Sequence, residues 1–242
     1  PSERDIGNNG SAEEFWTHFG FLIAQLRRVM KPGRNVAVHV QQVATTVAHD
    51  GVTGMSDFRG DVIRAFISDG FIFHGEVTID KDPQAQAIRT KSKGLLFVQK
   101  ERDRAWLRPA FADFILVFRA PGENAVPIRD DQITNDEWIE WARPIWYGIR
   151  ESETLNAAEA REQKDERHIA ALQLETVRRC VRLWSNPGEL VLDPFAGIGT
   201  TGYVAVQNGR RFVGCELKRS YFEAACRNIE RADNVLTLGL SA

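Results

Sequence analysis

The sequence has few of the residues that mark metal sites, disulfide frameworks or membrane segments. Its 242 residues include three cysteines, which form no Cys-x-x-Cys pair, and five histidines without His-x-x-x-His spacing. We therefore expect reduced thiols in the protein interior and no bound metal. No run of about 18 apolar residues occurs, so no transmembrane helix is expected. The polar N-terminal residues lack the apolar region of a signal peptide, and together these absences indicate a cytoplasmic protein.

Charge is distributed unevenly along the chain. The formal net charge is −2, which argues against indiscriminate binding to nucleic acid. Residues 81–108 nevertheless carry eight basic and three acidic side chains, a local net charge of +5. The basic residues are Lys81, Arg89, Lys91, Lys93, Lys100, Arg102, Arg104 and Arg108. Such a segment can be an ordinary solvated face, or it can contact the phosphates of a nucleic acid.

Hydrophobic periodicity predicts alternating helices and strands in the first half of the chain. A capping box formed by Ser11 and Glu14 starts a helix over residues 11–30, and a second helix is expected over residues 61–68. Runs of β-branched or continuously apolar residues predict strands at 35–40, 71–80 and 112–119. Residues 41–60 show no clear period, so no element is expected there.

The most regular pattern lies in the last quarter of the chain. Strands are predicted at 190–193, 211–216 and 234–238, and helices at 201–208 and 220–231. The alternation of strand and helix is typical of half of a doubly wound sheet. The earlier strands can supply the rest of that sheet, so the sequence predicts an α/β fold.

A glycine-rich turn follows the first of these strands. The stretch from Asp193 to Gly202 contains Gly-x-Gly-x-x-Gly, which lets a ligand approach the backbone at a helix N-terminus. Glu216, at the end of the next strand, can accept hydrogen bonds from both hydroxyl groups of a ribose. Asp193 would repel a pyrophosphate but attract the ammonium and sulfonium groups of S-adenosylmethionine (AdoMet). The pattern therefore favours AdoMet over NAD or FAD, and a glycine turn without a ligand is the alternative.

This region resembles the amino-methylating DNA methyltransferases, which act on the exocyclic nitrogen of adenine or cytosine. Val191–Thr201 is similar to the AdoMet motif of that family, with departures only at the spacer positions Ala196 and Ile198. Gly209–Glu216 is similar to the strand that follows the motif, and Tyr221 stands where the family often has a tyrosine. The resemblance implies AdoMet as the cofactor, with contacts from Asp193, Phe195, Gly197, Gly199, Thr200, Thr201 and Glu216.

Looser similarities extend the resemblance toward the N-terminus. Lys164–His168 resembles a motif that closes over the methionine end of AdoMet, which adds His168 to the implied contacts. The family usually has a proline shortly after this histidine, and this chain has Ile169 and two alanines instead. Leu26–Val38 resembles a segment of the family in which a Lys-Pro-Gly turn is followed by a strand. Because the AdoMet motif lies near the C-terminus, the order of the motifs along the chain resembles that of the permuted class of this family.

The resemblance has consequences for fold, partners and origin. It implies an α/β fold with a Rossmann-like AdoMet-dependent methyltransferase sheet, helices on both faces and permuted motif order. We expect one catalytic domain over residues 1–242, with a target-recognition insert at about 80–110 and an AdoMet-binding part at about 160–242. Pairing into a homodimer and a bacterial or phage restriction-modification role are typical of the family. The implied partner is double-stranded DNA, contacted by Lys91, Lys93, Arg102 and Arg104.

The catalytic motif of the family, Asp- or Ser-Pro-Pro followed by an aromatic residue, does not occur in the sequence. Its polar groups hold the target amine, and its aromatic side chain stacks on the base that is flipped out of the duplex. The catalytic residues are therefore unknown, and the motif is expected upstream of Pro1 or on a separate chain. A non-catalytic AdoMet-binding relative is one alternative. A methyltransferase acting on RNA or a small molecule is another.

Overall fold

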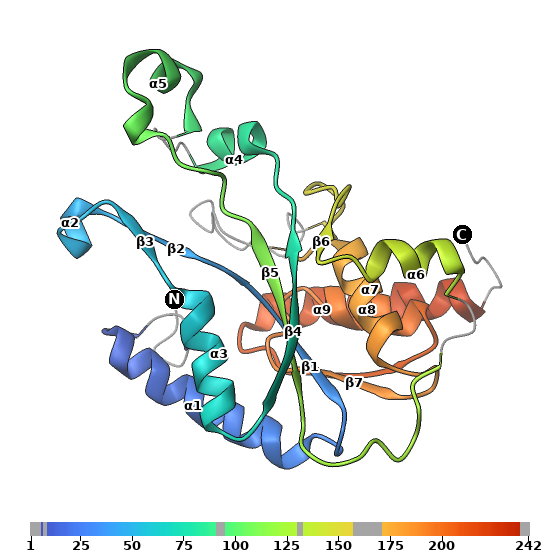
Figure 1. The fold of residues 1–242 in the computed structure, drawn as a ribbon. Coiled ribbons are helices and arrows are strands. Elements are labelled where there is room, and N and C mark those ends of the chain that lie inside the picture. Colours follow the sequence, from blue (N-terminus) through green and yellow to red (C-terminus); the bar gives the residue numbers. More distant parts are fainter. Residues whose placement is uncertain (1–5, 7–8, 91–94, 130–132, 157–170, 238–242) are drawn as a thin grey trace. The chain divides into compact units, whose positions relative to one another are not determined.

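The computed structural model describes all of the 242 residues except 1–5, 7–8, 91–94, 130–132, 157–170 and 238–242 (Figure 1). Its elements group into two compact units, which are described separately: residues 20–124 with 142–148, and residues 1–19 with 125–141 and 149–242. Helix α1 (Ala12–Val29) carries residues of both units. It begins with the expected capping interaction, in which the Glu14 N–H donates to Ser11 Oγ over 3.1 Å. The prediction of one catalytic domain stays a prediction.

A four-stranded sheet forms the centre of the unit that contains residues 20–124. Its order is β1-β5-β4-β6, and β5 is antiparallel to both β1 and β4, whereas β6 is parallel to β4. The strands are β1 (Asn35–Gln41), β4 (Ile72–Ile79), β5 (Asp113–Arg119) and β6 (Ile145–Trp146). Consequently β1, β4 and β6 run in the same direction, and their carboxyl ends lie at the same end of the sheet. The three strands predicted from the first half of the sequence are confirmed.

The core of this unit forms where helix α3 (Phe58–Ser68) packs on the sheet. Four consecutive residues of β5, from Ile115 to Phe118, are buried, which explains the continuous apolar run in the sequence. The Phe66 ring stacks on the Phe118 ring with centroids 4.2 Å apart. The helix begins three residues before its predicted start, because the Asp57 carboxylate caps it by accepting the Gly60 N–H over 3.1 Å.

Two extensions leave the sheet of this unit. The first follows β1 and consists of β2 (Val43–Thr45), α2 (Val47–Asp50) and β3 (Gly54–Ser56), with β2 antiparallel to β3. Most of its residues are exposed on both faces. Its sequence therefore has no alternation of apolar and polar residues from which the strands could be predicted. The second extension lies between β4 and β5 and contains α4 (Pro83–Thr90), α5 (Phe97–Arg102) and the 3₁₀ helix η3 (Arg104–Trp106). Figure 1 shows both extensions leading away from the sheet.

The other unit is built around two parallel strands joined by a helix. Strand β7 (Leu190–Asp193) pairs with β8 (Arg211–Gly214), and α8 (Thr200–Gln207) forms the crossover between them. Helix α8 packs against both strands, against α7 (Leu174–Trp184) and against α9 (Arg219–Thr237). Helix α6 (Asn135–Trp141) is tied to α7 by ion pairs, among them Arg179 with Glu140 at 2.6 Å.

The predicted strand over residues 234–238 is wrong, because α9 continues to Thr237 and residue 238 lies outside the described residues. No glycine or proline separates Arg231 from Asn234, so nothing in the sequence ends the helix there. Ala232 is fully buried, which favours continuation of the helix by packing. Residues 234–237 are the last turn of a helix, and the described elements from Leu190 onward follow the order βαβα.

A cluster of buried polar side chains lies at one end of the four-stranded sheet. Asp113 Oδ2 lies 2.7 Å from Lys81 Nζ and 3.0 Å from His39 Nε2, and its Oδ1 accepts a hydrogen bond from Gln41 Nε2 at 2.8 Å. The Lys81 side chain is only 3% exposed. Lys81 therefore neutralises a buried carboxylate. It does not belong to a basic surface, although the sequence analysis counted it among the basic residues of segment 81–108.

The charge of Asp113 contributes to stability. Burial would raise its pKa, but the hydrogen bonds from His39 and Lys81 outweigh burial and hold the pKa below its usual value. A carboxylate with a lowered pKa stabilises the folded state at pH above its unfolded pKa, about 3.9, and this contribution is lost as the pH falls through the folded pKa.

We expect Asp113→Asn to lower the free energy of unfolding by about 3 kcal/mol at pH 7, because it leaves the Lys81 ammonium buried without a counter-ion. The difference from the wild type should shrink as the pH falls below about 4. Urea denaturation at several pH values measures both effects. Asp61→Asn is the control, since its ion pair with Arg64 is exposed and should contribute less than about 1 kcal/mol. Equal losses in the two variants would contradict the role given to the buried pair.

Candidate functional site

Two carboxylates stand at the same edge of the β7–β8 pair. Asp193 is the last residue of β7, and Glu216 follows the end of β8 by two residues. The strands are parallel with Asp193 opposite Gly214, so their carboxyl ends coincide. The Glu216 Oε2 atom accepts a hydrogen bond from the Gly197 N–H over 2.8 Å, which joins the end of β8 to the loop that follows β7. The structure thus brings together the residues on which the sequence analysis depended.

The loop between β7 and α8 is braced by the carboxylate of Asp193. Its Oδ1 accepts from the Phe195 N–H at 2.9 Å, and its Oδ2 accepts from the Thr201 hydroxyl at 2.6 Å. Glu216 is oriented in a similar way, because its Oε1 accepts from the Lys218 N–H at 2.8 Å. Each carboxylate oxygen has a second lone pair that can accept a hydrogen bond from a ligand. Both groups are therefore held in place and can still bind an ammonium or a hydroxyl group.

The glycines of the loop serve two different purposes. Gly197 has φ +53°, and a Cβ at this position would meet only Phe195 O at 4.0 Å, so one side of the backbone is open to a ligand. Gly199 has φ +85°, and a Cβ there would lie 2.9 Å from the Cα of Ala225 in α9. Gly199 therefore allows the start of α8 to pack closely on α9. Its assignment as a cofactor contact stays a prediction.

Side chains of α9 contact the loop between β7 and α8. Ile198, which the sequence analysis treated as a spacer, is 3% exposed and packs with Ala224 and Tyr221. The Asn228 Nδ2 group donates to the Ile198 carbonyl over 2.9 Å and is itself buried. The sequence analysis missed Asn228. A signal existed, because this polar residue lies one helical turn after the buried Ala224 and Ala225, on the apolar face of α9.

Two apolar side chains near these carboxylates are exposed to solvent. Phe195, in the loop, is 56% exposed, and Leu217, directly after Glu216, is 54% exposed. Leu217 was also missed, although a leucine next to a strand-end acid was visible in the sequence. Thr200 is buried and begins α8. An exposed apolar pair beside two oriented carboxylates suits a ligand with a flat ring and a polar sugar.

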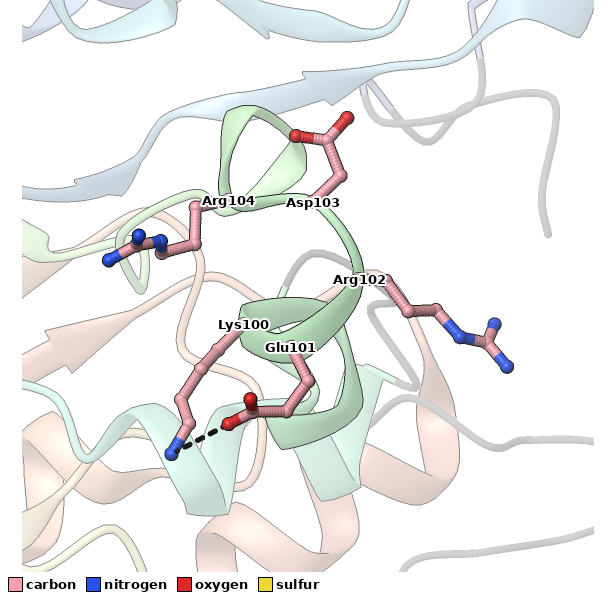
Figure 2. Close-up of a pocket in the computed structure, with 5 residues that line it drawn as sticks. All are labelled: Lys100, Glu101, Arg102, Asp103 and Arg104. Carbon is pink, nitrogen blue, oxygen red and sulfur yellow. Dashed lines mark ion pairs between the residues drawn. The ribbon is translucent and has the colours of Figure 1, made fainter.

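The remaining predicted residues lie elsewhere. His168, Lys91 and Lys93 fall outside the described residues. Arg102 and Arg104 belong to the unit of residues 20–124, where both are exposed in the segment between β4 and β5. Figure 2 shows their side chains extending to opposite sides of the backbone, with Lys100 paired to Glu101 at 3.2 Å.

Three further properties of the described residues concern thiols, metal ions and membranes. Burial raises the pKa of the Cys180 thiol to about 12, which makes this residue a poor nucleophile. Within the described part of the chain, no three His, Cys, Asp or Glu side chains gather where they could hold a metal ion. None of the described helices is both long and apolar enough to cross a membrane.

Comparisons with known proteins agree with this geometry. TTHA0409 of Thermus thermophilus, assigned as a DNA modification methylase and solved with S-adenosyl-L-methionine, has a TM-score of 0.72. It is 22% identical, over 96% of this chain and 83% of its own. The cytosine-N4-specific PvuII DNA methyltransferase has a TM-score of 0.66 and 19% identity, over 97% and 80% of the two chains. These likenesses confirm the predicted Rossmann-like methyltransferase fold with its permuted order.

Sequence comparisons identify the family. The type II methyltransferase M.BglI of Bacillus subtilis is 30% identical over 121 residues, which are 49% of this chain. The match spans 30% of the length of M.BglI. The model of the N6/N4 DNA methylase family matches residues 2–227. With its two strand-end carboxylates, its glycine loop and its methyltransferase fold, the chain belongs to the N6/N4 family of DNA methylases.

Proposed function

We propose that this protein binds AdoMet at the edge formed by Asp193 and Glu216 and transfers the methyl group to an exocyclic amine of adenine or cytosine in DNA. The observation that carries the proposal is the Glu216–Gly197 hydrogen bond, which sets a carboxylate beside an open glycine backbone at a helix N-terminus. Family membership supports DNA as the substrate. The relative M.BglI is named a type II methyltransferase, and the fold neighbour PvuII is named cytosine-N4-specific.

Each residue of the site has a proposed task. Glu216 accepts hydrogen bonds from the ribose hydroxyl groups. Asp193 faces the positive end of the cofactor, and the bonds from Phe195 and Thr201 keep its carboxylate oriented. Leu217 lies beside Glu216 and contacts the adenine ring. The role of His168 at the methionine end rests on the family resemblance alone.

The same geometry favours AdoMet over a dinucleotide. A pyrophosphate at this helix N-terminus would lie near the carboxylates of Asp193 and Glu216, which would repel it. AdoMet has no phosphate and carries its positive charge on the ammonium and sulfonium groups. It supplies a methyl group that is activated for direct displacement. The chain contributes binding and orientation, which can by themselves account for a large part of the rate.

The transfer that we propose needs no covalent intermediate on the protein. The amine of the flipped base must be held with its lone pair in line with the methyl group. The motif that would hold it, Asp- or Ser-Pro-Pro followed by an aromatic residue, does not occur in this sequence. Cofactor binding can therefore be tested with this chain, and methyl transfer is tested with and without a second polypeptide that carries this motif.

DNA contact is proposed for the segment between β4 and β5, through Arg102, Arg104, Lys91 and Lys93. A restriction-modification role, a homodimer and a cytoplasmic location in a bacterial or phage-infected cell are parts of the same proposal and rest on the family. An RNA or small-molecule methyltransferase and a non-catalytic relative are the alternatives. Methylation assays on DNA, on RNA and without nucleic acid separate them.

The cofactor proposal predicts that AdoMet and S-adenosylhomocysteine bind this chain with a Kd of about micromolar order, and that NAD does not bind. Asp193→Ala should abolish binding of both ligands, because it removes the carboxylate that faces the positive end of AdoMet and that orients the loop. Calorimetric titration gives the affinities, and circular dichroism checks the fold. Asp61→Asn, a change on the exposed surface of α3 in the other unit, is the control. Unchanged AdoMet binding by Asp193→Ala would contradict the assignment.

The two glycines should respond differently to alanine. Gly197→Ala should weaken AdoMet binding while costing about 1 kcal/mol of stability, because its Cβ enters open space but φ is positive. Gly199→Ala should lower the free energy of unfolding by about 2 kcal/mol or more, because its Cβ overlaps Ala225. Urea denaturation and calorimetric titration of both variants test this division. A larger stability loss for Gly197→Ala than for Gly199→Ala would show that the roles are reversed.

The DNA proposal predicts an effect of salt. Reversing the charge of Lys91, Lys93 and Arg102 to Glu should weaken duplex binding and reduce the slope of log Kd against log salt by about 0.9 for each phosphate that is no longer bound. Fluorescence anisotropy at several salt concentrations measures both quantities. Lys31→Glu, at an exposed turn, is the matched control. If the triple variant changes neither affinity nor slope, the segment does not bind DNA.

A further inference from the structure

The segment between α4 and β5 ends in a small structure without a core, which we call the tip (Leu96–Leu107). It contains α5 and η3, and no residue of either helix is buried. Its largest apolar side chains face solvent instead: Phe97 is 70% exposed and Trp106 is 65% exposed. Within the described chain, neither ring contacts another ring or a cation. Exposed aromatic residues gathered on one small element mark an interaction surface more often than scattered apolar residues do.

The charges of the tip show which kind of partner it fits. Glu101 pairs with Lys100, and the Asp103 carboxylate accepts the Ala105 N–H over 2.9 Å, so both acids are engaged within the tip. Arg102 and Arg104 have no ion-pair partner among the described residues, and Figure 2 shows their side chains extending away from the backbone. The tip therefore has a net charge of +1 and presents two guanidinium groups without an ion-pair partner among the described residues, together with two exposed aromatic rings.

A nucleic acid with an unstacked base is the partner that matches both features. Its phosphates bind arginine, and its exposed base faces stack on aromatic side chains. A lipid surface or an acidic peptide without aromatic residues would satisfy the charge, but neither presents planar rings to Trp106. Trp106 is the better candidate for stacking than Phe97, since it is larger and lies two residues from Arg104 and four from Arg102.

We propose that the tip inserts Trp106 into the gap that the flipped target base leaves in the duplex, while Arg102 and Arg104 bind the flanking phosphates. This inference rests on the proposed function, because a methyltransferase that acts on an exocyclic amine must take its base out of the stack. Removing the base leaves its neighbours without a stacking partner. An inserted indole restores part of that stacking and delays the return of the base.

The test compares two synthetic duplexes of the same sequence, one intact and one with a single abasic site, which mimics the vacated position. Binding is measured by fluorescence anisotropy with the full chain in the presence of S-adenosylhomocysteine. The wild type should bind the abasic duplex about tenfold more tightly than the intact one. Trp106→Ala should reduce this preference to nearly one while leaving the salt dependence unchanged, and Trp106→Phe should restore part of it.

The arginines should behave in the opposite manner. The double variant Arg102→Gln/Arg104→Gln should weaken binding to both duplexes equally and reduce the salt slope by about 1.8, with the preference for the abasic duplex retained. Trp138→Ala is the matched control, because this tryptophan is 57% exposed but lies on α6. It should change neither the preference nor the slope.

Several results would overturn the inference. If Trp106→Ala keeps the wild-type preference, Trp106 does not enter the gap. If the variant instead changes the sedimentation coefficient, the tip is an interface between copies of the chain. A wild type that binds AdoMet and intact DNA without preferring the abasic duplex removes the inference and leaves the proposed function standing. A wild type that binds AdoMet but neither duplex removes DNA as the substrate as well.

Discussion

The candidate site depends on the parallel pairing of β7 with β8. Both strands have only four residues, and a shift of one residue would turn the Asp193 side chain to the opposite face. The register is secured at the far end of the pair by Arg210, which is 3% exposed. Its guanidinium donates to the Ser185 carbonyl over 2.8 Å and to the Ser185 hydroxyl over 3.2 Å. Arg210, at the opposite end of the strands from the loop, thus helps to determine the positions of both carboxylates.

The loop itself is held from three sides before any ligand arrives. Asp193 braces it from the end of β7, Glu216 from the end of β8, and Asn228 from α9. Donors and acceptors fixed in this way lose little conformational entropy on binding, which is the physical basis of preorganisation. The arrangement also explains why glycine occurs at two positions for different reasons, one facing the open side and one facing a neighbouring helix.

Most of the fold could be predicted from the sequence because its strands are short, strongly apolar and bounded by clear breaks. The loop residues could be predicted for the same reason, since a strand end fixes where Asp193 must lie. The extension over residues 43–56 could not, because exposure on both faces leaves no periodicity. Lys81 was misread because its charge shows in the sequence but its partner, Asp113, lies 32 residues away. Asn228 was missed because a polar residue on an apolar helix face has meaning only when its acceptor is known.

The segment between β4 and β5 combines a fixed base with an exposed end. At the base, the Gln86 side chain is 1% exposed and exchanges two hydrogen bonds with the backbone of Phe111, at 2.9 and 2.7 Å. Beyond the base no side chain of α5 or η3 is buried, so the end is free to adapt to a partner. Because Arg102 and Arg104 have no ion-pair partner among the described residues, the end presents two guanidinium groups and has a net charge of +1. A chain of net charge −2 can therefore attract a polyanion at one place without attracting it everywhere, and such attraction must weaken as salt is added.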